Sequence, residues 1–186
     1  MGRLTSYMFT SLDGYIADLD GGLEWVPIDE ELMVFANGYF RACDGIVFGR
    51  NVYEGFVSYW DHLDPVIASA TEVGFAEIFR GMQRIVASTT LSQVPIGTTL
   101  LDDDVPGAIA ELKDTSEGDL LLICGPDLRS ALAAQGLIDR YRTLVAPVLL
   151  GDGVPLFRSA HQPISLRLAG SSTFGGGVVM LDHVPA

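Results

Sequence analysis

The stretch that decides the fold is DGIVFGRNVYE, residues 44–54, where a short apolar run stops at Gly49 and a helix is predicted from Arg50. The stretch LLLICGPDL, residues 120–128, has the same arrangement, with a fully apolar strand that ends at Gly125. A strand that is apolar throughout is buried on both faces, which is typical of a parallel sheet covered by helices. The two stretches therefore predict an α/β protein.

The residues on either side continue this alternation. Strand-like composition predicts strands at 3–10 and 84–87. Apolar residues at helical spacing predict helices at about 30–43, 71–82, 105–113 and 128–136. Asp29 is the predicted N-cap of the first helix, and Cys43 closes its apolar stripe. The order of elements is that of a repeated β-α unit.

After residue 139 the pattern changes. Strands are predicted at 140–145, 166–169 and 178–182, with glycine-rich turns between them and no helix. Such a section adds antiparallel hairpins to the edge of a sheet. The whole sequence thus predicts a three-layer α/β fold over residues 1–186 as one domain. Its central sheet is mostly parallel with helices on both faces, and its C-terminal strands are antiparallel.

Charge and composition exclude several classes of function. The 186 residues include 24 Asp and Glu against 11 Lys and Arg, a formal charge of −13, so binding to nucleic acid or to an anionic membrane is not expected. Lys113 is the only lysine and lies in a polar helix end, which argues against a Walker-type phosphate loop and Schiff-base chemistry. With no apolar run long enough for a membrane span and no signal-peptide pattern, a cytoplasmic protein is predicted.

Cysteines and histidines predict no metal site. Cys43 and Cys124 are interpreted as buried thiols, because each lies in an apolar pattern. His62, His161 and His183 are far apart and lack the spacing of metal ligands.

Four predicted strand ends carry residues suited to a ligand. In an open α/β sheet, ligands bind outside the carboxyl ends of the strands, which here are Thr10–Ser11, Gly49–Arg50, Ser88–Thr89 and Gly125–Pro126. At the second and fourth of these a helix begins directly after a glycine, so its free N–H groups can hold a phosphate. Two such turns in one sheet suit a dinucleotide. Any strand–helix connection can also be built this way, so a purely structural role stays open.

Four segments carry a resemblance to a known family. Residues 11–17 (SLDGYIA), 44–54 and 86–91 (VASTTL) are each similar to a short family motif, and a longer similarity runs from Gly125 through GLID at 136–139 to PVLLGDGVPLF at 147–157. In this order they span essentially the whole chain. The sequence therefore resembles the dihydrofolate reductase-like superfamily, and within it a stand-alone member of the branch that contains the reductase domain of riboflavin biosynthesis.

The resemblance implies a dihydrofolate reductase-like fold, NADPH as cofactor, a small-molecule substrate and a homodimer. The implied cofactor contacts fall into three groups: the adenosine-side phosphates at Gly49, Arg50 and Asn51, with Ser88 and Thr89 near the 2′-phosphate; the pyrophosphate along Gly125, Pro126, Asp127 and Leu128; and the nicotinamide beside Ile16 and Ala17, above Phe9, Thr10 and Ser11. Because dihydrofolate reductases join a glycine pair at this turn by a cis peptide, a cis Gly125–Pro126 bond is a further hypothesis.

Departures from the family motifs bear on the choice of cofactor. Val52 replaces the usual threonine and Thr89 a common basic residue, which leaves Arg50 as the evident cation for a 2′-phosphate. Asp127 is unfavourable beside a pyrophosphate. NADPH is therefore expected, with NADH as an alternative.

The reaction implied by the resemblance is hydride transfer to a small pterin- or pyrimidine-like heterocycle, as in dihydrofolate reductase and 5-amino-6-(5-phosphoribosylamino)uracil reductase. Ile123 stands where the riboflavin-pathway enzymes carry a substrate-binding glutamate, and Tyr15 where they tend to carry lysine. Both differences argue against the ribosylaminopyrimidine itself as substrate. The alternative function is an inactive nucleotide-binding dimer, or a regulatory or structural protein, on the same fold.

The predicted substrate site comprises Ser11, Asp13, Trp25 and Tyr53. Asp13 is the candidate catalytic carboxylate, but Asp-Gly is also a common turn pair, and Glu30 is a second candidate for handling the proton. Trp25 can stack on a flat heterocycle or pack within its loop. Tyr53 can reach the substrate from its helix or belong to the core.

Overall fold

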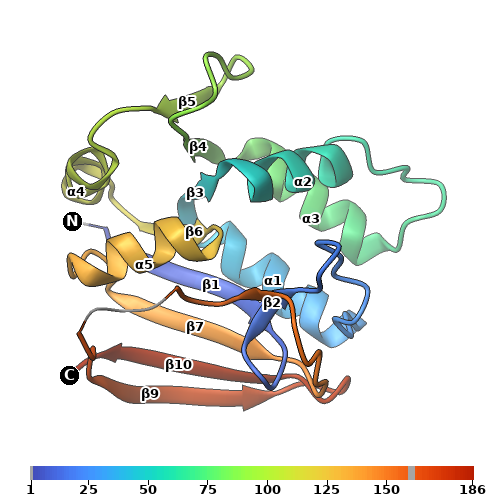
Figure 1. Ribbon diagram of the computed structural model, residues 1–186. Helices are drawn as coiled ribbons and strands as arrows, with labels where there is room; N and C mark the ends of the chain where they lie inside the picture. Colours follow the sequence, from blue (N-terminus) through green and yellow to red (C-terminus); the bar gives the residue numbers. More distant parts are fainter. Residues whose placement is uncertain (1, 159–161) are drawn as a thin grey trace.

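Strands and helices are interspersed along the chain up to residue 145 in the computed structural model, which describes residues 2–158 and 162–186 (Figure 1). In chain order the elements are β1 (Leu4–Thr10), β2 (Tyr15–Ala17), α1 (Glu30–Arg41), β3 (Cys43–Gly49), α2 (Arg50–Trp60), α3 (Ala70–Gly81), β4 (Gln83–Ala87), β5 (Thr98–Leu101), α4 (Val105–Thr115), β6 (Asp119–Ile123), α5 (Pro126–Ala134), β7 (Arg140–Val145), β8 (Val154–Pro155), β9 (Leu166–Thr173) and β10 (Val179–Pro185).

Eight strands form one sheet in the order β5-β4-β3-β6-β1-β7-β10-β9. The strands from β5 to β7 are parallel, and β10 and β9 join them antiparallel, so the predicted mixed sheet is confirmed. The assignment of 140–145 to the antiparallel part is wrong, since β7 pairs parallel with β1 and Met8 lies opposite Thr143. The reason is that α5 forms a crossover between β6 and β7, which returns the chain in the same direction.

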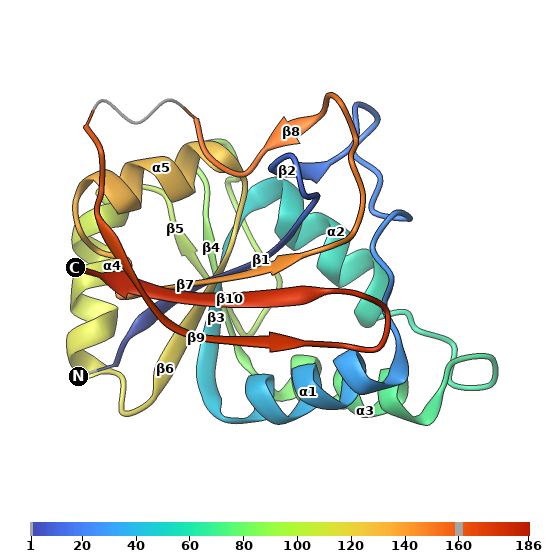
Figure 2. The same ribbon diagram turned by 90° about the horizontal axis from the view of Figure 1, so that it is seen from below.

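Helices cover both faces of the sheet (Figure 2). α1, α2 and α3 pack on one face around Phe40, Phe48 and Phe79, and α4 and α5 pack on the other around Val47 and Leu132. Neighbouring residues of a strand point to opposite faces, so Val47 and Phe48 of β3 enter different cores. The continuous apolar run at 45–48 is explained by this two-sided burial, and the three-layer prediction is confirmed.

Local boundaries differ from the sequence prediction at a few places. Cys43 does not close α1, because the helix ends at Arg41 and Cys43 opens β3, although its thiol still donates a hydrogen bond to the Tyr39 carbonyl (3.3 Å). The apolar spacing crosses the boundary because both elements face the same core. Strands β2, β5 and β8 were not predicted. β2 and β8 are very short and pair across a large sequence separation, which local periodicity does not report.

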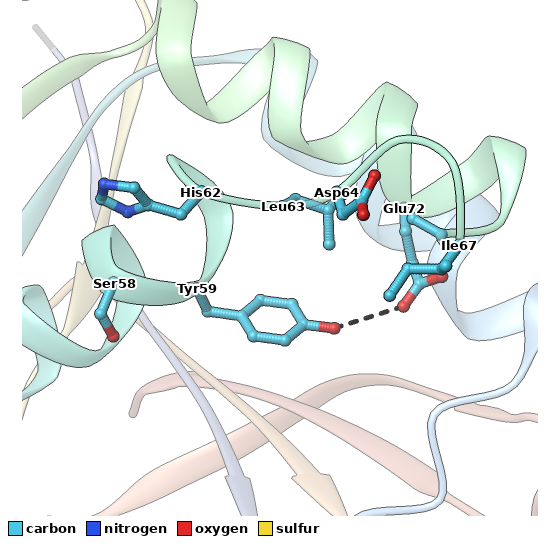
Figure 3. Close-up of a pocket in the computed structure, with 8 residues that line it drawn as sticks. Ser58, Tyr59, His62, Leu63, Asp64, Ile67 and Glu72 are labelled. Atoms are coloured by element: carbon cyan, nitrogen blue, oxygen red, sulfur yellow. Dashed lines mark hydrogen bonds between the residues drawn. The ribbon is translucent and has the colours of Figure 1, made fainter.

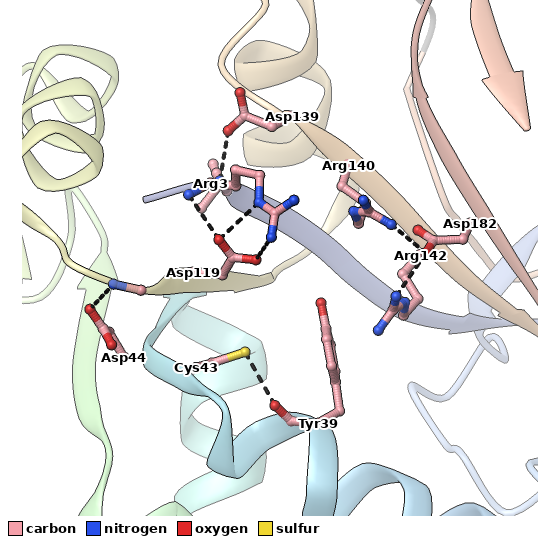
Figure 4. A network of polar contacts seen from close by, with 11 residues as sticks. Arg3, Tyr39, Cys43, Asp44, Asp119, Asp139, Arg140, Arg142 and Asp182 are labelled. Carbon is pink, nitrogen blue, oxygen red and sulfur yellow. Dashed lines mark hydrogen bonds and ion pairs between the residues drawn. The ribbon is translucent and has the colours of Figure 1, made fainter. Parts of the chain in front are cut away.

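Ion pairs connect β10, in the C-terminal part of the sheet, to β7 (Figure 4). The buried carboxylate of Asp182 on β10 accepts hydrogen bonds from Arg140 (2.6 Å) and Arg142 (2.7 Å) of β7. The guanidinium of Arg142 also lies 4.1 Å from the centre of the Tyr39 ring on α1. Loss of one partner would leave a buried charge uncompensated, so this group specifies how β10 and α1 meet β7.

Candidate functional site

The starts of α2 and α5 lie in contact at the carboxyl edge of the sheet. β3 and β6 are neighbours, with Phe48 opposite Ile123, and each passes into its helix through a glycine. A Cβ placed on Gly49 would lie 3.3 Å from the Cys124 Cβ and 3.6 Å from the Gly125 nitrogen. The φ of Gly49 is −82°, which other residues adopt, so the close approach and not the backbone angle favours glycine here.

These two helices differ from the others in how they begin. Asp29, Ser69 and Asp104 cap α1, α3 and α4, each by accepting a hydrogen bond from a first-turn N–H. Gly49 and Gly125 are the N-caps of α2 and α5 and offer no side-chain oxygen. The first-turn N–H groups of α2 and α5 therefore have no side-chain cap, which is the arrangement that binds anions at helix N-termini.

The hypothesis of a cis Gly125–Pro126 bond is wrong, because the described residues contain no cis peptide bond. Gly125 has extended backbone angles (φ −68°, ψ 174°), and Pro126 occupies the first turn of α5. Residues before proline favour this extended region, and proline fits the first helical position in the trans form. The chain can therefore enter α5 without the cis bond.

Charged side chains surround the two helix starts. Arg50 is exposed, and its Nε donates a hydrogen bond to the Oδ1 of the neighbouring Asn51 (3.3 Å). Asp127 in the first turn of α5 is also exposed and pairs with Arg158 (3.1 Å). Arg158 thus offsets part of the negative charge that makes Asp127 unfavourable beside a phosphate, a partner that the sequence did not indicate.

Asp13 joins two loops at the end of β1. Its carboxylate accepts hydrogen bonds from the Ser11 hydroxyl (2.6 Å) and from the N–H groups of Leu150 (3.1 Å) and Gly151 (2.7 Å). The Ser11 hydroxyl in turn accepts one from the Tyr15 N–H (2.9 Å). The hydrogen bonds from these donors lower the pKa of Asp13, and the bond from the Ser11 hydroxyl has the largest effect. The carboxylate is therefore held ionised, which suits orientation of the loops better than donation of a proton.

The nicotinamide side of the predicted site lies on β1 and β2. Thr10 is buried at the end of β1, and Phe9 packs against the core on the α1 face. Ile16 is buried on β2 and Ala17 is half-buried, and β2 pairs with β8. The segment 147–158, which we call the strap, thus runs beside every predicted residue of β2.

The end of β4 holds the residues predicted to meet the 2′-phosphate. β4 is the neighbour of β3, so Ser88 and Thr89 lie at the same sheet edge as Gly49. The Ser88 hydroxyl is buried and accepts hydrogen bonds from the N–H groups of Thr90 (3.2 Å) and Leu91 (3.1 Å). Thr89 is exposed. Ser88 therefore shapes the turn, and Thr89 is the residue of the two that faces solvent.

Trp25 and Tyr53 both have internal contacts. The indole N–H of Trp25 donates a hydrogen bond to the Gly22 carbonyl (3.1 Å), and its ring is half-buried. Tyr53 is 5 % exposed, its ring is tilted against that of Phe48 with 5.8 Å between the ring centres, and its hydroxyl shares a hydrogen bond with the Thr98 hydroxyl (3.3 Å). The structure therefore places Tyr53 in the core beneath the α2 start, with its hydroxyl at the beginning of β5.

Arg129 is a residue of this region that sequence reasoning missed. It lies on α5 and is fully buried, and its guanidinium donates hydrogen bonds to the carbonyls of Cys124 (2.6 Å) and Leu156 (3.1 Å). The segment LRSALAA carries an arginine at a position whose helical spacing is equally compatible with an exposed face. Burial follows from the strap, which covers this side of α5 and which only tertiary structure places.

Two cavities lie away from this edge of the sheet. One of about 370 Å³ opens between the end of α2 and the start of α3, where the Tyr59 hydroxyl donates to Glu72 at 3.4 Å (Figure 3). Another of about 450 Å³ lies between the ends of α1 and α3, beside Cys43. Neither is lined by a residue predicted to bind cofactor or substrate. His161 of the sequence prediction lies outside the described residues.

Two features are absent from residues 2–158 and 162–186. These ranges contain no cluster of three or more His, Cys, Asp or Glu side chains that could hold a metal ion. In the same ranges, no helix has the length and apolar character needed to cross a bilayer.

Comparisons with known proteins place this geometry in a family. The family described as RibD C-terminal domain matches residues 3–180. Uncharacterized protein YyaP of Bacillus subtilis (strain 168) is 27% identical over 182 residues, which cover 97% of this chain and 94% of that protein. The crystal structure of a putative riboflavin biosynthesis protein from Shewanella sp. PV-4 is 26% identical with a TM-score of 0.79, and the match covers 100% of this chain and 99% of that one.

More distant structures show the fold. A diaminohydroxyphosphoribosylaminopyrimidine deaminase/5-amino-6-(5-phosphoribosylamino)uracil reductase from Thermotoga maritima has 15% identity and a TM-score of 0.66, over 100% of this chain and 57% of that one. A dihydrofolate reductase from Enterococcus faecalis, complexed with NADP(H), has 14% identity and a TM-score of 0.66, over 98% and 96%. The predicted dihydrofolate reductase-like fold is confirmed, and with nearly its whole length matched, the chain belongs to the RibD C-terminal domain family.

Proposed function

We propose that this chain is an NADPH-dependent reductase that transfers a hydride to a small pterin- or pyrimidine-like heterocycle. The observation that carries the proposal is the contact between the α2 and α5 starts at Gly49 and Gly125, with no side-chain cap on either helix. Their first-turn N–H groups are available to the phosphates of a single dinucleotide. Family membership supports this, because related folds include a reductase complexed with NADP(H) and a uracil reductase.

The residues predicted from the resemblance keep their proposed roles at this edge. Arg50 and Thr89 are exposed beside the α2 start, where they can select the 2′-phosphate of NADPH over NADH. The pyrophosphate would lie along the first turn of α5, and the nicotinamide beside β2. Substrate contacts at Ser11, Trp25 and Tyr53 stay predictions, and Tyr53 acts most directly by supporting the α2 start from below.

Asp13 is proposed to act in its ionised form. Hydride transfer leaves the protein to position the nicotinamide, the acceptor and a proton source. The carboxylate of Asp13 already accepts three hydrogen bonds that tie Ser11 to the strap. Its catalytic contribution would therefore be to fix the position of Ser11 and the strap at the substrate site.

We further propose that two copies associate through β9 and β10. β9 is the edge strand of the sheet and pairs on one side only, with β10. Leu166, Leu168 and Val179 are exposed on these strands, on the face away from α1. An eight-residue edge strand with exposed leucines is a ready surface for a second copy, and a two-fold axis lets the same patch serve both partners.

The reductase proposal is tested with the purified chain. Tryptophan fluorescence is followed while NADPH or NADH is added, and NADPH absorbance is then followed with reducible pterins, flavins and quinazolines as acceptors. Saturable binding with acceptor-dependent loss of NADPH is the expected result. Binding without oxidation of NADPH by any acceptor would instead indicate a nucleotide-binding protein, and absence of binding would contradict the proposed site.

A further inference from the structure

Arg129 places a positive charge directly behind the start of α5. Its side chain is 0 % exposed, and its guanidinium donates hydrogen bonds to the carbonyls of Cys124 (2.6 Å) and Leu156 (3.1 Å). Side chains on a helix lean toward its N-terminus, so Arg129, at the fourth position of α5, reaches back to the residue before Gly125. The charge therefore lies at the turn to which the anion site has been assigned.

This charge has no counter-ion among residues 2–158 and 162–186. Arg129 forms no ion pair with a carboxylate in these ranges, and its Nε has no hydrogen-bond partner. Burial lowers the pKa of Arg129, which reflects the cost of removing the cation from water. Arginine nevertheless stays protonated in proteins. The guanidinium meets two carbonyls and lies 5.8 Å from the centre of the Phe157 ring, but it meets no carboxylate in these ranges. A buried cation with such partners leaves a local positive potential that is not fully neutralised.

Other basic side chains that are largely buried are neutralised. Each meets a carboxylate: Lys113 meets Asp139 at 2.7 Å, Arg84 meets Asp61 at 2.8 Å, and Arg140 and Arg142 meet Asp182 at 2.6 and 2.7 Å. Arg129 differs from these residues because no carboxylate of the described residues pairs with it. It lies at the edge of the sheet where two helices begin without side-chain caps.

We propose that Arg129 is the internal counter-charge for a diphosphate group bound at the Gly125 turn, an inference that rests on the proposed function. The guanidinium acts across the turn and does not contact the ligand, because a charge in a low-dielectric interior attracts an anion several ångströms away. It offsets Asp127 and the net charge of −13, both of which repel a polyanionic cofactor. Arg129 is in this sense a positioning residue of the cofactor site.

A matched pair of variants separates the charge from the packing. Arg129→Gln and Arg129→Lys both shorten the side chain and keep a donor for the Cys124 and Leu156 carbonyls, but only lysine keeps the charge. Arg84→Gln is the control, because it removes an arginine near the start of β4, at the opposite end of that strand from Ser88. The probe is inorganic pyrophosphate, measured by thermal stabilisation of each folded variant and by competition with NADPH fluorescence.

The expected result is that Arg129→Gln weakens pyrophosphate and NADPH binding about tenfold or more, as loss of a unit charge several ångströms from the ligand predicts. Arg129→Lys should stay within about threefold of the wild type, with a lower melting temperature, and Arg84→Gln should bind normally. Equal affinities of the Gln and Lys variants would overturn the inference, whether both are normal or both are weakened. Wild-type binding of pyrophosphate without NADPH would overturn the reductase and leave the anion site, and binding of neither would overturn both.

Discussion

Charged residues at the carboxyl edge of the sheet divide into those that face solvent and those that hold the protein together. Arg50 is exposed and bonds only its neighbour Asn51 among the described residues. Asp13 is hydrogen-bonded to Ser11 and the strap, and Arg129 to the carbonyl of Cys124 before α5 and to that of Leu156 in the strap. Residues of the first kind can contribute to affinity for a ligand with little effect on folding, whereas residues of the second kind affect both.

Replacement of Arg50 by alanine should separate the two cofactors. A charge-assisted contact to the 2′-phosphate contributes about 1.5–3 kcal/mol, so the affinity for NADPH should fall about tenfold or more while that for NADH changes little. Fluorescence titration with both cofactors measures this, and Arg41→Ala at the end of α1 is the control for a lost surface charge. Equal losses for both cofactors would assign Arg50 to the structure of the α2 start.

Replacement of Asp13 by asparagine should destabilise the protein in a pH-dependent way. The pKa of Asp13 is lowered in the folded state, so the stabilisation is present above the ordinary carboxyl value of 3.8 and is lost as the pH falls through the lowered pKa. The difference in unfolding free energy between wild type and Asp13→Asn should therefore be largest near neutral pH and shrink below about pH 4. Denaturant unfolding across this range measures it, with the exposed Asp114→Asn as control. A difference independent of pH would contradict the ionised role.

At the scale of elements, the site depends on two strand–helix connections that meet. β3 and β6 are adjacent. α2 follows β3 directly and α5 begins three residues after the end of β6, so α2 and α5 start side by side. The strap completes the site by tying β2 to α5. Its Leu156 N–H donates to the Gly14 carbonyl (2.8 Å), and its Arg158 N–H donates to the Ser130 hydroxyl (2.9 Å).

The contact between the two helix starts predicts that Gly49 tolerates substitution poorly. A methyl group at Gly49 would lie 3.3 Å from the Cys124 Cβ, so Gly49→Ala should cost about 1–3 kcal/mol and weaken cofactor binding as the turns separate. A Cβ placed on Gly55 of the same helix would have no neighbour within 4 Å, so Gly55→Ala should raise helix stability by about 0.5–1 kcal/mol. Denaturant unfolding of both variants measures the contrast. Similar effects at the two positions would show that the turns are not closely packed.

At the scale of the whole molecule, the sheet is covered unevenly. Its centre, from β4 to β7, lies between helices on both faces, whereas β9 at one edge is exposed at nearly every position. Such an edge carries unpaired backbone groups, and partners commonly add there. The C-terminal hairpin is held to β7 by Asp182 and its two arginines, so it is anchored before any partner binds.

The proposed dimer predicts a mass near twice the 20.0 kDa of the chain, measured by size-exclusion chromatography with light scattering. Leu168→Asp places a charge on the exposed face of β9 and should shift the protein to monomer. The control is Val66→Asp, which alters an apolar residue 87 % exposed in the loop between α2 and α3. A wild-type monomer, or dissociation by both variants, would contradict the interface.

The sequence by itself determined the fold class and predicted the residues of the candidate site. Continuous apolar runs at 45–48 and 120–124 can be buried only in a sheet covered on both faces, and the glycine that ends each run begins a helix. These features can be recognised in the sequence itself, because each depends on the identity of a few consecutive residues. The family resemblance was carried by such local motifs and is confirmed by the match over residues 3–180.

Tertiary structure alone decided which strands are neighbours and what lies behind the site. The parallel pairing of β7, the Asp13 hydrogen bonds to the strap and the burial of Arg129 all join segments far apart in the chain. Local periodicity reports which side of an element is apolar, and it does not report which other element covers that side. A buried arginine and an exposed one therefore look alike in sequence, and only packing of the strap against α5 distinguishes them.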